Sequence, residues 1–404
     1  MGWRLLSAAA EVPHFMTLQP APPRPQPVPL LATTGRRRRL EALARTMVAW
    51  VPTERARCDL DLLITGAMSP LSGFLGRADY ESVCDRMRLV DGTLWPMPIT
   101  LDVPAEVAGR VGPGDGLALR EPGGTLLGVL WIEDVWAPDP RAEAEAVFRT
   151  TSDAHPGVVH LFERTHPFYV GGRVEASHRP FFPSFGRLSP GPLTVRSEFA
   201  RRGWERVVAF HTRNPMHRAH FELTRQAAEA VGAALLLHPV VGMTKPGDVD
   251  PVTRIRCYQA LLHRYPTGRA LMAPIPMAMR MSGPRDSLWN AILRATYGCT
   301  HYIVGRDHAS PGPDHDGRPF YDPYEAQDIL FRHEAETGIT TVAFPALTYV
   351  PALDRYVPAG DVAEGAETRT VSGTELRSLL ASGGEIPEWI TFPEVAAVLR
   401  GSRA

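Results

Sequence analysis

The sequence predicts a multidomain α/β protein in which a doubly wound parallel sheet follows a β-rich first domain. From about residue 206 onward, short strand-like apolar segments alternate with helix-like segments, which is typical of a parallel sheet. Between about 60 and 175, short apolar stretches are separated by Gly-Pro and Gly-Gly turns, which indicates compact antiparallel β structure with some helix. The length of 404 residues also exceeds the usual size of one hydrophobic core, so we expect two or three packed units.

The N-terminal region is interpreted as a tail followed by the β-rich domain. Residues 1–30 are rich in proline, which favours extended backbone, so we expect a flexible tail. The basic run Arg36 to Arg39 leads into leucine, alanine and glutamate, which indicates the solvated start of a helix rather than a phosphate-steering patch. We expect the first domain over 31–178. A linker rich in proline, serine and glycine is expected over 176–200.

The second domain is expected over 179–349. Its predicted strands are 206–210, 235–241, 271–274, 301–304 and 340–344, and its predicted helices run from Pro215 to Ala230, over 252–265 and over 287–297. Residues 350–404 are expected to form a small C-terminal helical domain, because a capping-box pattern from Ser372 to Glu375 precedes several leucines.

Composition excludes several classes of protein. The 43 lysines and arginines balance 44 acidic residues, which is the wrong charge for a nucleic-acid binder. The four cysteines form no C-x-x-C pair, so we expect reduced thiols in a cytoplasmic protein. The apolar run Leu5 to Ala10 is too short for a secretory signal, and no stretch approaches the roughly 18 apolar residues of a membrane span. We therefore expect neither nucleic acid nor membrane as a partner.

Polar and basic side chains follow the predicted strand 206–210. Ligands of open α/β sheets bind beyond the carboxyl ends of the strands, and a helix N-terminus at that edge favours phosphate. His217 and His220 are three residues apart, so they share one face of the next helix and can donate hydrogen bonds to phosphate oxygens. A metal site would need ligands that the sequence does not supply, and core burial does not explain Arg213 and Asn214 alongside. The sequence therefore predicts a phosphate site without a protein-bound metal.

A second polar turn follows the predicted strand 301–304. Gly305 lets a ligand approach the backbone closely, and the planar guanidinium of Arg306 suits oxyanions. Taken alone, Arg306 and Asp307 would equally suit a structural ion pair.

Two further segments support the same site. The arginines of 279–286 are candidates to complete an anion pocket, while its methionines are expected to pack. Lys245, in the loop 240–248, either closes over a triphosphate or belongs to a surface turn.

Together these segments resemble the single-chain sulfate adenylyltransferases, also called ATP sulfurylases. The resemblance runs from about residue 30 to the C-terminus, through 68–74, 91–96, 212–220, 279–284, 305–309 and 372–377. It implies a PUA-like N-terminal domain, a Rossmann-like nucleotidyltransferase catalytic domain and a small C-terminal domain. The HxxH turn is a variant of the signature of the wider nucleotidyltransferase class.

The resemblance also implies an activity and residue roles. Sulfate would attack the α-phosphorus of ATP in line, with Mg²⁺ accompanying the nucleotide and pyrophosphate leaving. The implied catalytic residues are Thr212, Arg213, Asn214, His217 and His220. The implied ATP contacts are His211, Thr212, Arg213, Asn214, Gly305, Arg306, Asp307, His308 and Leu347. Sulfate would contact His211, Arg213 and the backbone N–H of Ala309, and Phe344 matches a residue that responds to nucleotide binding. We expect a homo-oligomer that is coupled to a downstream kinase or pyrophosphatase, because the product anhydride is energetically uphill.

Two positions depart from the family pattern. His211 stands where the family has glutamine, and Ser310 stands where glycine usually follows the alanine. Imidazole is bulkier than glutamine, titrates near neutral pH and places its donor differently. One alternative is therefore an adenylyltransferase for another oxyanion or for an organic sulfonate or phosphonate. A second alternative is a nucleotide-binding relative without catalysis, although the intact catalytic set argues against it.

Overall fold

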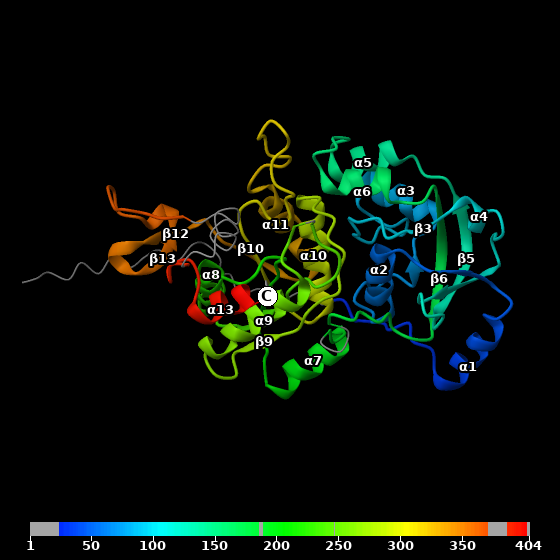
Figure 1. The fold of residues 1–404 in the computed structure, drawn as a ribbon, viewed down its shortest axis with the longest axis horizontal. Helices are drawn as coiled ribbons and strands as arrows, with labels where there is room; N and C mark the ends of the chain where they lie inside the picture. The colour runs from blue at the N-terminus through cyan, green and yellow to red at the C-terminus, as the bar shows by residue number, and fades with distance from the viewer. Residues whose placement is uncertain (1–23, 186–188, 246, 371–385, 402–404) are drawn as a thin grey trace, which may run out of the picture.

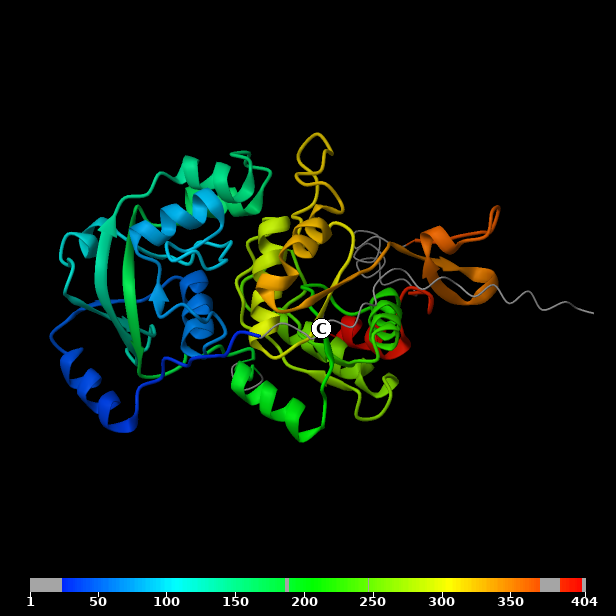
Figure 2. The same ribbon diagram turned by 180° about the vertical axis from the view of Figure 1, so that it is seen from behind.

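The computed structural model describes residues 24–185, 189–245, 247–370 and 386–401. The β-rich domain lies at one end of the elongated molecule, the parallel sheet lies in the middle, and a β-hairpin lies at the other end (Figures 1 and 2). No helix within the described residues is both long enough and apolar enough to cross a bilayer.

The first domain is built on a six-stranded sheet. Its order is β1-β4-β5-β6-β2, with β3 also paired to β6, and all pairs are antiparallel except β1 with β4. The strands are β1 (Val48–Trp50), β2 (Gly73–Phe74), β3 (Leu101–Val103), β4 (Gly116–Arg120), β5 (Leu126–Trp136) and β6 (Phe168–Ala176). The helices are α1 (Thr34–Leu43), α2 (Glu54–Ile64), α3 (Arg77–Arg86), α4 (Ala105–Ala108), α5 (Pro140–Phe148) and α6 (Pro156–Glu163). The helix predicted at the basic run is confirmed, and Arg36 pairs with Glu175 of β6 at 2.6 Å.

The second sheet has five strands that are all parallel, in the order β11-β10-β7-β8-β9. They are β7 (Val207–Phe210), β8 (Ala234–Leu237), β9 (Ala270–Met272), β10 (His301–Val304) and β11 (Thr340–Ala343). The helices that follow or precede them are α7 (Pro192–Arg201), α8 (Arg218–Ala230), α9 (Pro251–Leu261), η1 (Leu262–Arg264), α10 (Pro284–Thr296) and α11 (Glu325–Thr337). The central strand β7 and its neighbour β8 are buried throughout, which explains their continuous apolar sequence. The predicted parallel sheet is confirmed.

Two segments expected to be irregular are ordered. The linker 176–200 contains most of α7, which begins with Pro192 after Gly191. The N–H of the first helical residue has no partner within the helix, so a proline there loses no hydrogen bond. Residues 24–30, expected to belong to a flexible tail, run along both domains. Arg24 donates to the Gly298 carbonyl at 2.5 Å, and the Leu30 N–H donates to the Ile64 carbonyl at 3.0 Å. These hydrogen bonds correct the expectation for 24–30, while 1–23 lie outside the described residues.

The C-terminal region is not purely helical, which corrects the prediction. It contains the antiparallel hairpin β12 (Leu347–Val350) and β13 (Arg355–Pro358), the short turns η2 (Pro351–Leu353) and η3 (Ala359–Asp361), and helix α13 (Pro393–Gly401). Helix α13 packs on α9, and its Val395 joins the apolar cluster that contains Tyr258 and Leu261. The predicted capping box from Ser372 to Glu375 falls outside the described residues.

The arginines of 279–286 join the two domains instead of completing an anion pocket. The Arg280 guanidinium donates to the Asp59 carboxylate of α2 at 2.5 Å, with both side chains at most 4% exposed. Arg285 donates to the carbonyls of Val83 and Cys84, at 3.1 Å and 2.7 Å. These arginines, which were candidates to complete an anion pocket, instead donate to the first domain and, for Arg280, also to the Ala278 carbonyl.

We expect the Asp59→Asn substitution to destabilise the protein strongly. It leaves the buried Arg280 charge without its counter-charge, which costs about 3 to 5 kcal/mol in comparable pairs. The midpoint of thermal unfolding measures the effect. Glu81→Gln, which breaks the exposed pair of Arg77 with Glu81, is the matched control and should cost about 1 kcal/mol or less. Equal midpoints for the two variants would contradict the assignment of Arg280 and Asp59 as a stabilising link.

Candidate active site

Three turns meet at one edge of the parallel sheet. Strands β7 and β10 are neighbours, with Val208 opposite His301, so their carboxyl ends open at the same edge. The turn after β8 reaches the turn after β10, because Lys245 Nζ donates to the Pro311 carbonyl at 3.1 Å. Lys245 thus ties two turns together, and the residues predicted for two separate motifs form one cradle.

A buried tyrosine connects the first and second motifs. The Tyr302 hydroxyl, on β10, lies 2.7 Å from Nδ1 of His211 and 2.7 Å from Nε2 of His308. The two imidazole rings are 5.2 Å apart between centroids. His211 is only 4% exposed. The two turns therefore converge on one hydroxyl.

Both of these imidazoles are neutral at neutral pH. Burial lowers the pKa of His211 well below its ordinary value and lowers the pKa of His308 to about 4. The Arg294 guanidinium on α10 lowers both pKa values further, because its charge opposes a second positive charge nearby.

Arg213 is held by a carboxylate of the neighbouring turn. Its guanidinium forms an ion pair with Asp248, which also accepts a hydrogen bond from the Lys245 backbone N–H at 3.1 Å. The side chains of Arg213 and Asp248 are 20% and 7% exposed. An anion that binds Arg213 would meet a guanidinium already orientated by this turn.

Thr212 and Asn214 shape the first turn. The Thr212 hydroxyl oxygen accepts a hydrogen bond from the Asn214 backbone N–H at 3.1 Å, and the Thr212 carbonyl accepts one from the Val240 N–H at 3.2 Å. The Tyr258 hydroxyl lies 3.5 Å from the Asn214 carbonyl. The Asn214 side chain is exposed at the mouth of the cradle.

The two histidines of the HxxH turn stack at the start of α8. His217 is the N-cap residue with extended backbone, and His220 lies one turn further on, with ring centroids 3.8 Å apart. In each ring Nδ1 is buried without a hydrogen-bond partner among the described residues. Burial lowers the pKa of His220 to about 4, and burial together with His220 lowers the pKa of His217 well below its ordinary value. The helix thus presents two neutral imidazoles beside its N-terminal N–H groups.

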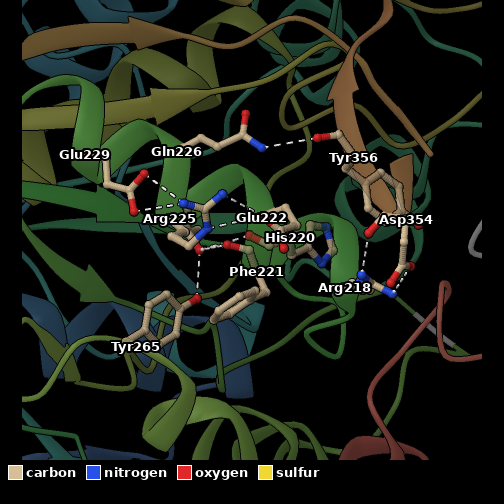
Figure 3. A network of polar contacts seen from close by, with 11 residues as sticks. Arg218, His220, Phe221, Glu222, Arg225, Gln226, Glu229, Tyr265, Asp354 and Tyr356 are labelled. Atoms are coloured by element: carbon tan, nitrogen blue, oxygen red, sulfur yellow. Dashed lines mark hydrogen bonds and ion pairs between the residues drawn. The ribbon is translucent and has the colours of Figure 1, made fainter. Parts of the chain in front are cut away.

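Helix α8 is anchored on both sides (Figure 3). Arg218 pairs with Asp354 of the β12–β13 hairpin at 3.2 Å, and Gln226 donates to the Tyr356 carbonyl at 3.3 Å. Opposite the hairpin, the Tyr265 hydroxyl lies 2.7 Å from the Thr224 hydroxyl. These contacts fix the helix that carries His217 and His220.

The turn after β10 has strained backbone at two positions. Asp307 and Ala309 have φ of 55° and 56°, in the left-handed region that such residues seldom adopt. The Asp307 N–H donates to the Pro323 carbonyl at 2.8 Å, and the Ala309 carbonyl accepts from the Gly283 N–H at 3.1 Å. The Ala309 N–H has no partner among the described residues. Arg306 is 53% exposed and lies 3.3 Å from Asp307, and Gly305 leaves open space where a side chain would stand.

Phe344 and Leu347 lie at the neighbouring strand end. The Phe344 N–H donates to the Val304 carbonyl at 3.0 Å, which places it beside the turn after β10. Leu347 begins β12 and is partly buried.

A cavity of about 490 Å³ lies elsewhere, and it is lined by parts of 68–74 and 91–96 together with residues of α10 and α11. A cavity of this volume lies in the usual range for a small-molecule site. Its lining has few groups suited to an anion, whereas the cradle gathers arginine, lysine and imidazole donors. The chemistry of the side chains therefore favours the cradle.

Comparison with known proteins identifies the family of this chain. Residues 187–402 match the ATP-sulfurylase family, and residues 21–179 match a PUA-like domain. The chain is 48% identical to the sulfate adenylyltransferase of Schizosaccharomyces pombe over 368 residues, which are 91% of this chain and 75% of that protein. The chain belongs to the ATP-sulfurylase family.

Other members of this family and a related structure differ in length. The sulfate adenylyltransferase of Neosartorya fischeri is also 48% identical, over 90% of this chain, which spans 64% of that protein. This chain also resembles a solved structure described as a hexameric APS kinase from Thiobacillus denitrificans, with a TM-score of 0.76 and 30% sequence identity. The match covers 93% of this chain and 67% of the chain in that structure.

Sequence reasoning missed three residues of this candidate site. Tyr302 lies inside a predicted strand, and the side chains of a strand point alternately to the two faces of the sheet. Only this alternation could have indicated that Tyr302 faces His211. Asp248 lies in the loop 240–248, where the sequence pointed only to Lys245. Arg294 is on α10, fully buried, and its Nε and Nη2 have no hydrogen-bond partner among the described residues. No sequence pattern marked it, because a helical arginine usually faces solvent.

Proposed function

We propose that this protein catalyses the reaction of ATP and sulfate to adenosine 5′-phosphosulfate and pyrophosphate. The observation that carries the proposal is the convergence of Arg213, His211 and His308 in one cradle of a chain 48% identical to sulfate adenylyltransferases. Two anionic substrates need such clustered donors to approach each other.

A sulfate oxygen attacks the α-phosphorus, and the bond from that phosphorus to the bridging oxygen of the β-phosphate breaks. Pyrophosphate leaves with the electron pair. Sulfate is already ionised, so no base has to remove a proton. Catalysis then consists of alignment and stabilisation of negative charge as it moves toward the leaving group.

Each predicted site residue has a role in this proposal. Thr212, Arg213 and Asn214 align the reacting groups, and His217 and His220 donate hydrogen bonds to the phosphates. Sulfate lies near His211, Arg213 and the Ala309 N–H. The nucleotide lies along the first turn, along Gly305 to His308 and toward Leu347, and Phe344 shifts when it binds.

Mg²⁺ is proposed to arrive with the nucleotide. Within the described residues, no three histidine, cysteine, aspartate or glutamate side chains are grouped to hold a metal ion. Triphosphate oxygens and water are the ligands that Mg²⁺ prefers, so the cradle needs to bind only the complex. The ion would supply charge neutralisation on the phosphates.

We further propose a homo-oligomer, which the hexameric structural relative supports. The division into a first domain, a catalytic domain and a small C-terminal domain is also proposed, with the first boundary near residue 179. Because the product anhydride is uphill, an enzyme that consumes the product or pyrophosphate must draw the reaction forward.

The test is sulfate-dependent release of pyrophosphate by the purified protein with ATP and Mg²⁺. Pyrophosphate release that needs sulfate supports the proposal. Release only with selenate, molybdate, an organic sulfonate or a phosphonate would assign another acceptor, and ATP binding without release for any acceptor would indicate a non-catalytic relative.

We expect His211→Gln to maintain or improve the use of sulfate. Glutamine offers an amide N–H in a smaller side chain, as the family pattern does at this position. The measurement is kcat/KM for the same panel of acceptors in the wild type and the variant. An unchanged ranking of acceptors would show that His211 does not determine the choice of anion.

A further inference from the structure

The Tyr302 hydroxyl joins two histidines that the proposed function places on different substrates. His211 would adjoin sulfate, and His308 would adjoin the nucleotide. The hydroxyl lies 2.7 Å from Nδ1 of the first ring and 2.7 Å from Nε2 of the second. Tyr302 is fully buried, so no water competes for its hydroxyl from bulk solvent.

The remaining ring nitrogens are available for ligands. Nε2 of His211 and Nδ1 of His308 have no hydrogen-bond partner among the described residues. A neutral imidazole carries one N–H and one bare nitrogen. The Arg294 guanidinium from α10 is a charged group that faces both rings, and His211 also faces the imidazoles of His308 and of the buried His238 after β8, whose own pKa lies well below its ordinary value. These groups disfavour a charged imidazole.

A single hydroxyl proton links the two rings. If Tyr302 donates to Nδ1 of His211, its oxygen accepts from Nε2–H of His308, and both rings carry their proton on Nε2. If the direction reverses, both rings carry their proton on Nδ1. In either arrangement one ring offers a donor to its ligand and the other offers an acceptor, so the two rings cannot both donate.

We propose that Tyr302 is a positioning residue that makes His211 present Nε2–H to sulfate while His308 presents bare Nδ1 to the nucleotide. This inference rests on the proposed function. Sulfate has only acceptor oxygens, so it selects the arrangement in which His211 donates. His308 then accepts a hydrogen bond from an amino or hydroxyl group of the nucleotide and does not donate to a phosphate oxygen.

The first test reads the positions of the protons directly. Protein labelled with ¹⁵N-histidine is mixed with sulfate and α,β-methylene-ATP, whose P–C–P bridge cannot be cleaved. We expect the imidazole ¹⁵N shifts of both rings to report Nε2–H, with assignments made from His211→Gln and His308→Gln. A proton on Nδ1 of His211, or rings protonated on different nitrogens, would overturn the proposal.

The second test separates positioning from packing. We expect Tyr302→Phe to raise the KM for sulfate about tenfold in the wild-type background, which is the size of effect that neighbouring hydrogen-bonded residues have on each other. In the His211→Gln background the same change should raise it about twofold or less, because the amide supplies its own N–H without Tyr302. Equal effects in both backgrounds would show a merely structural role.

The two proposals fail in different ways. If the wild type releases no pyrophosphate with sulfate, the proposed function fails. The ¹⁵N shifts of the ligand-free protein still test the hydroxyl link, because the two rings must carry their protons on the same nitrogen whatever the substrate. Rings protonated on different nitrogens in the ligand-free wild type would overturn the link itself.

Discussion

Arg213→Ala is expected to lower kcat/KM for sulfate by at least about a hundredfold while the protein stays folded. Loss of a single donor that stabilises developing charge costs this much in well-studied enzymes, and Arg213 contributes a charged donor. Its partner Asp248 belongs to a turn at the mouth of the cradle, not to the hydrophobic core. Pyrophosphate release measures the activity, and circular dichroism with thermal unfolding measures the fold.

Two control variants sharpen this result. Arg213→Lys keeps the charge but loses the planar fork, so it should retain part of the activity. Arg225→Ala removes an arginine from α8 whose ion-pair partners among the described residues are Glu222 and Glu229 on the same helix (Figure 3), so it should change kcat/KM by less than about twofold. Full activity of Arg213→Ala would show that the cradle is not the site of reaction.

The parallel sheet was predictable because its sequence carries its own pattern. Strands buried on both faces, such as Val207–Phe210 and Ala234–Leu237, read as uninterrupted apolar runs, and amphipathic helices separate them. Helix α7 was not predicted, since its proline and glycine start resembles a linker. The hairpin β12–β13 was not predicted either, because its polar residues gain their partners from α8.

The candidate site was predictable in its residue types and less so in its contacts. The rule that ligands bind beyond parallel strand ends predicts that the turns after β7 and β10 meet, and these strands are neighbours with the rings of His211 and His308 5.2 Å apart. The partner of Arg280 could not be predicted, because Asp59 is distant in sequence and belongs to another domain. For the same reason, sequence spacing could not reveal the hydroxyl shared by His211 and His308.

Replacing His217 or His220 is expected to lower kcat by about a hundredfold to a thousandfold, with little change in KM for ATP. Neutral imidazoles at the N-terminus of α8 can donate to the phosphates as charge grows on the leaving group, and this interaction is strongest in the transition state. Because the rings stack at 3.8 Å, we expect the double alanine variant to lose less than the product of the single losses.

Matched amide variants identify the nitrogen that donates. Nδ1 of each ring is buried, so Nε2 is the atom left to reach the phosphates. Glutamine places its amide nitrogen near the position of Nε2, whereas asparagine places it near Nδ1. The glutamine variants at 217 and 220 should therefore retain more kcat than the asparagine variants. If asparagine rescues better, the rings must turn on substrate binding, and the orientation in this structure is not the one that donates. If alanine leaves kcat unchanged, the HxxH turn has no part in the chemistry, and leaving-group stabilisation must come from Lys245 and the backbone N–H groups of α8.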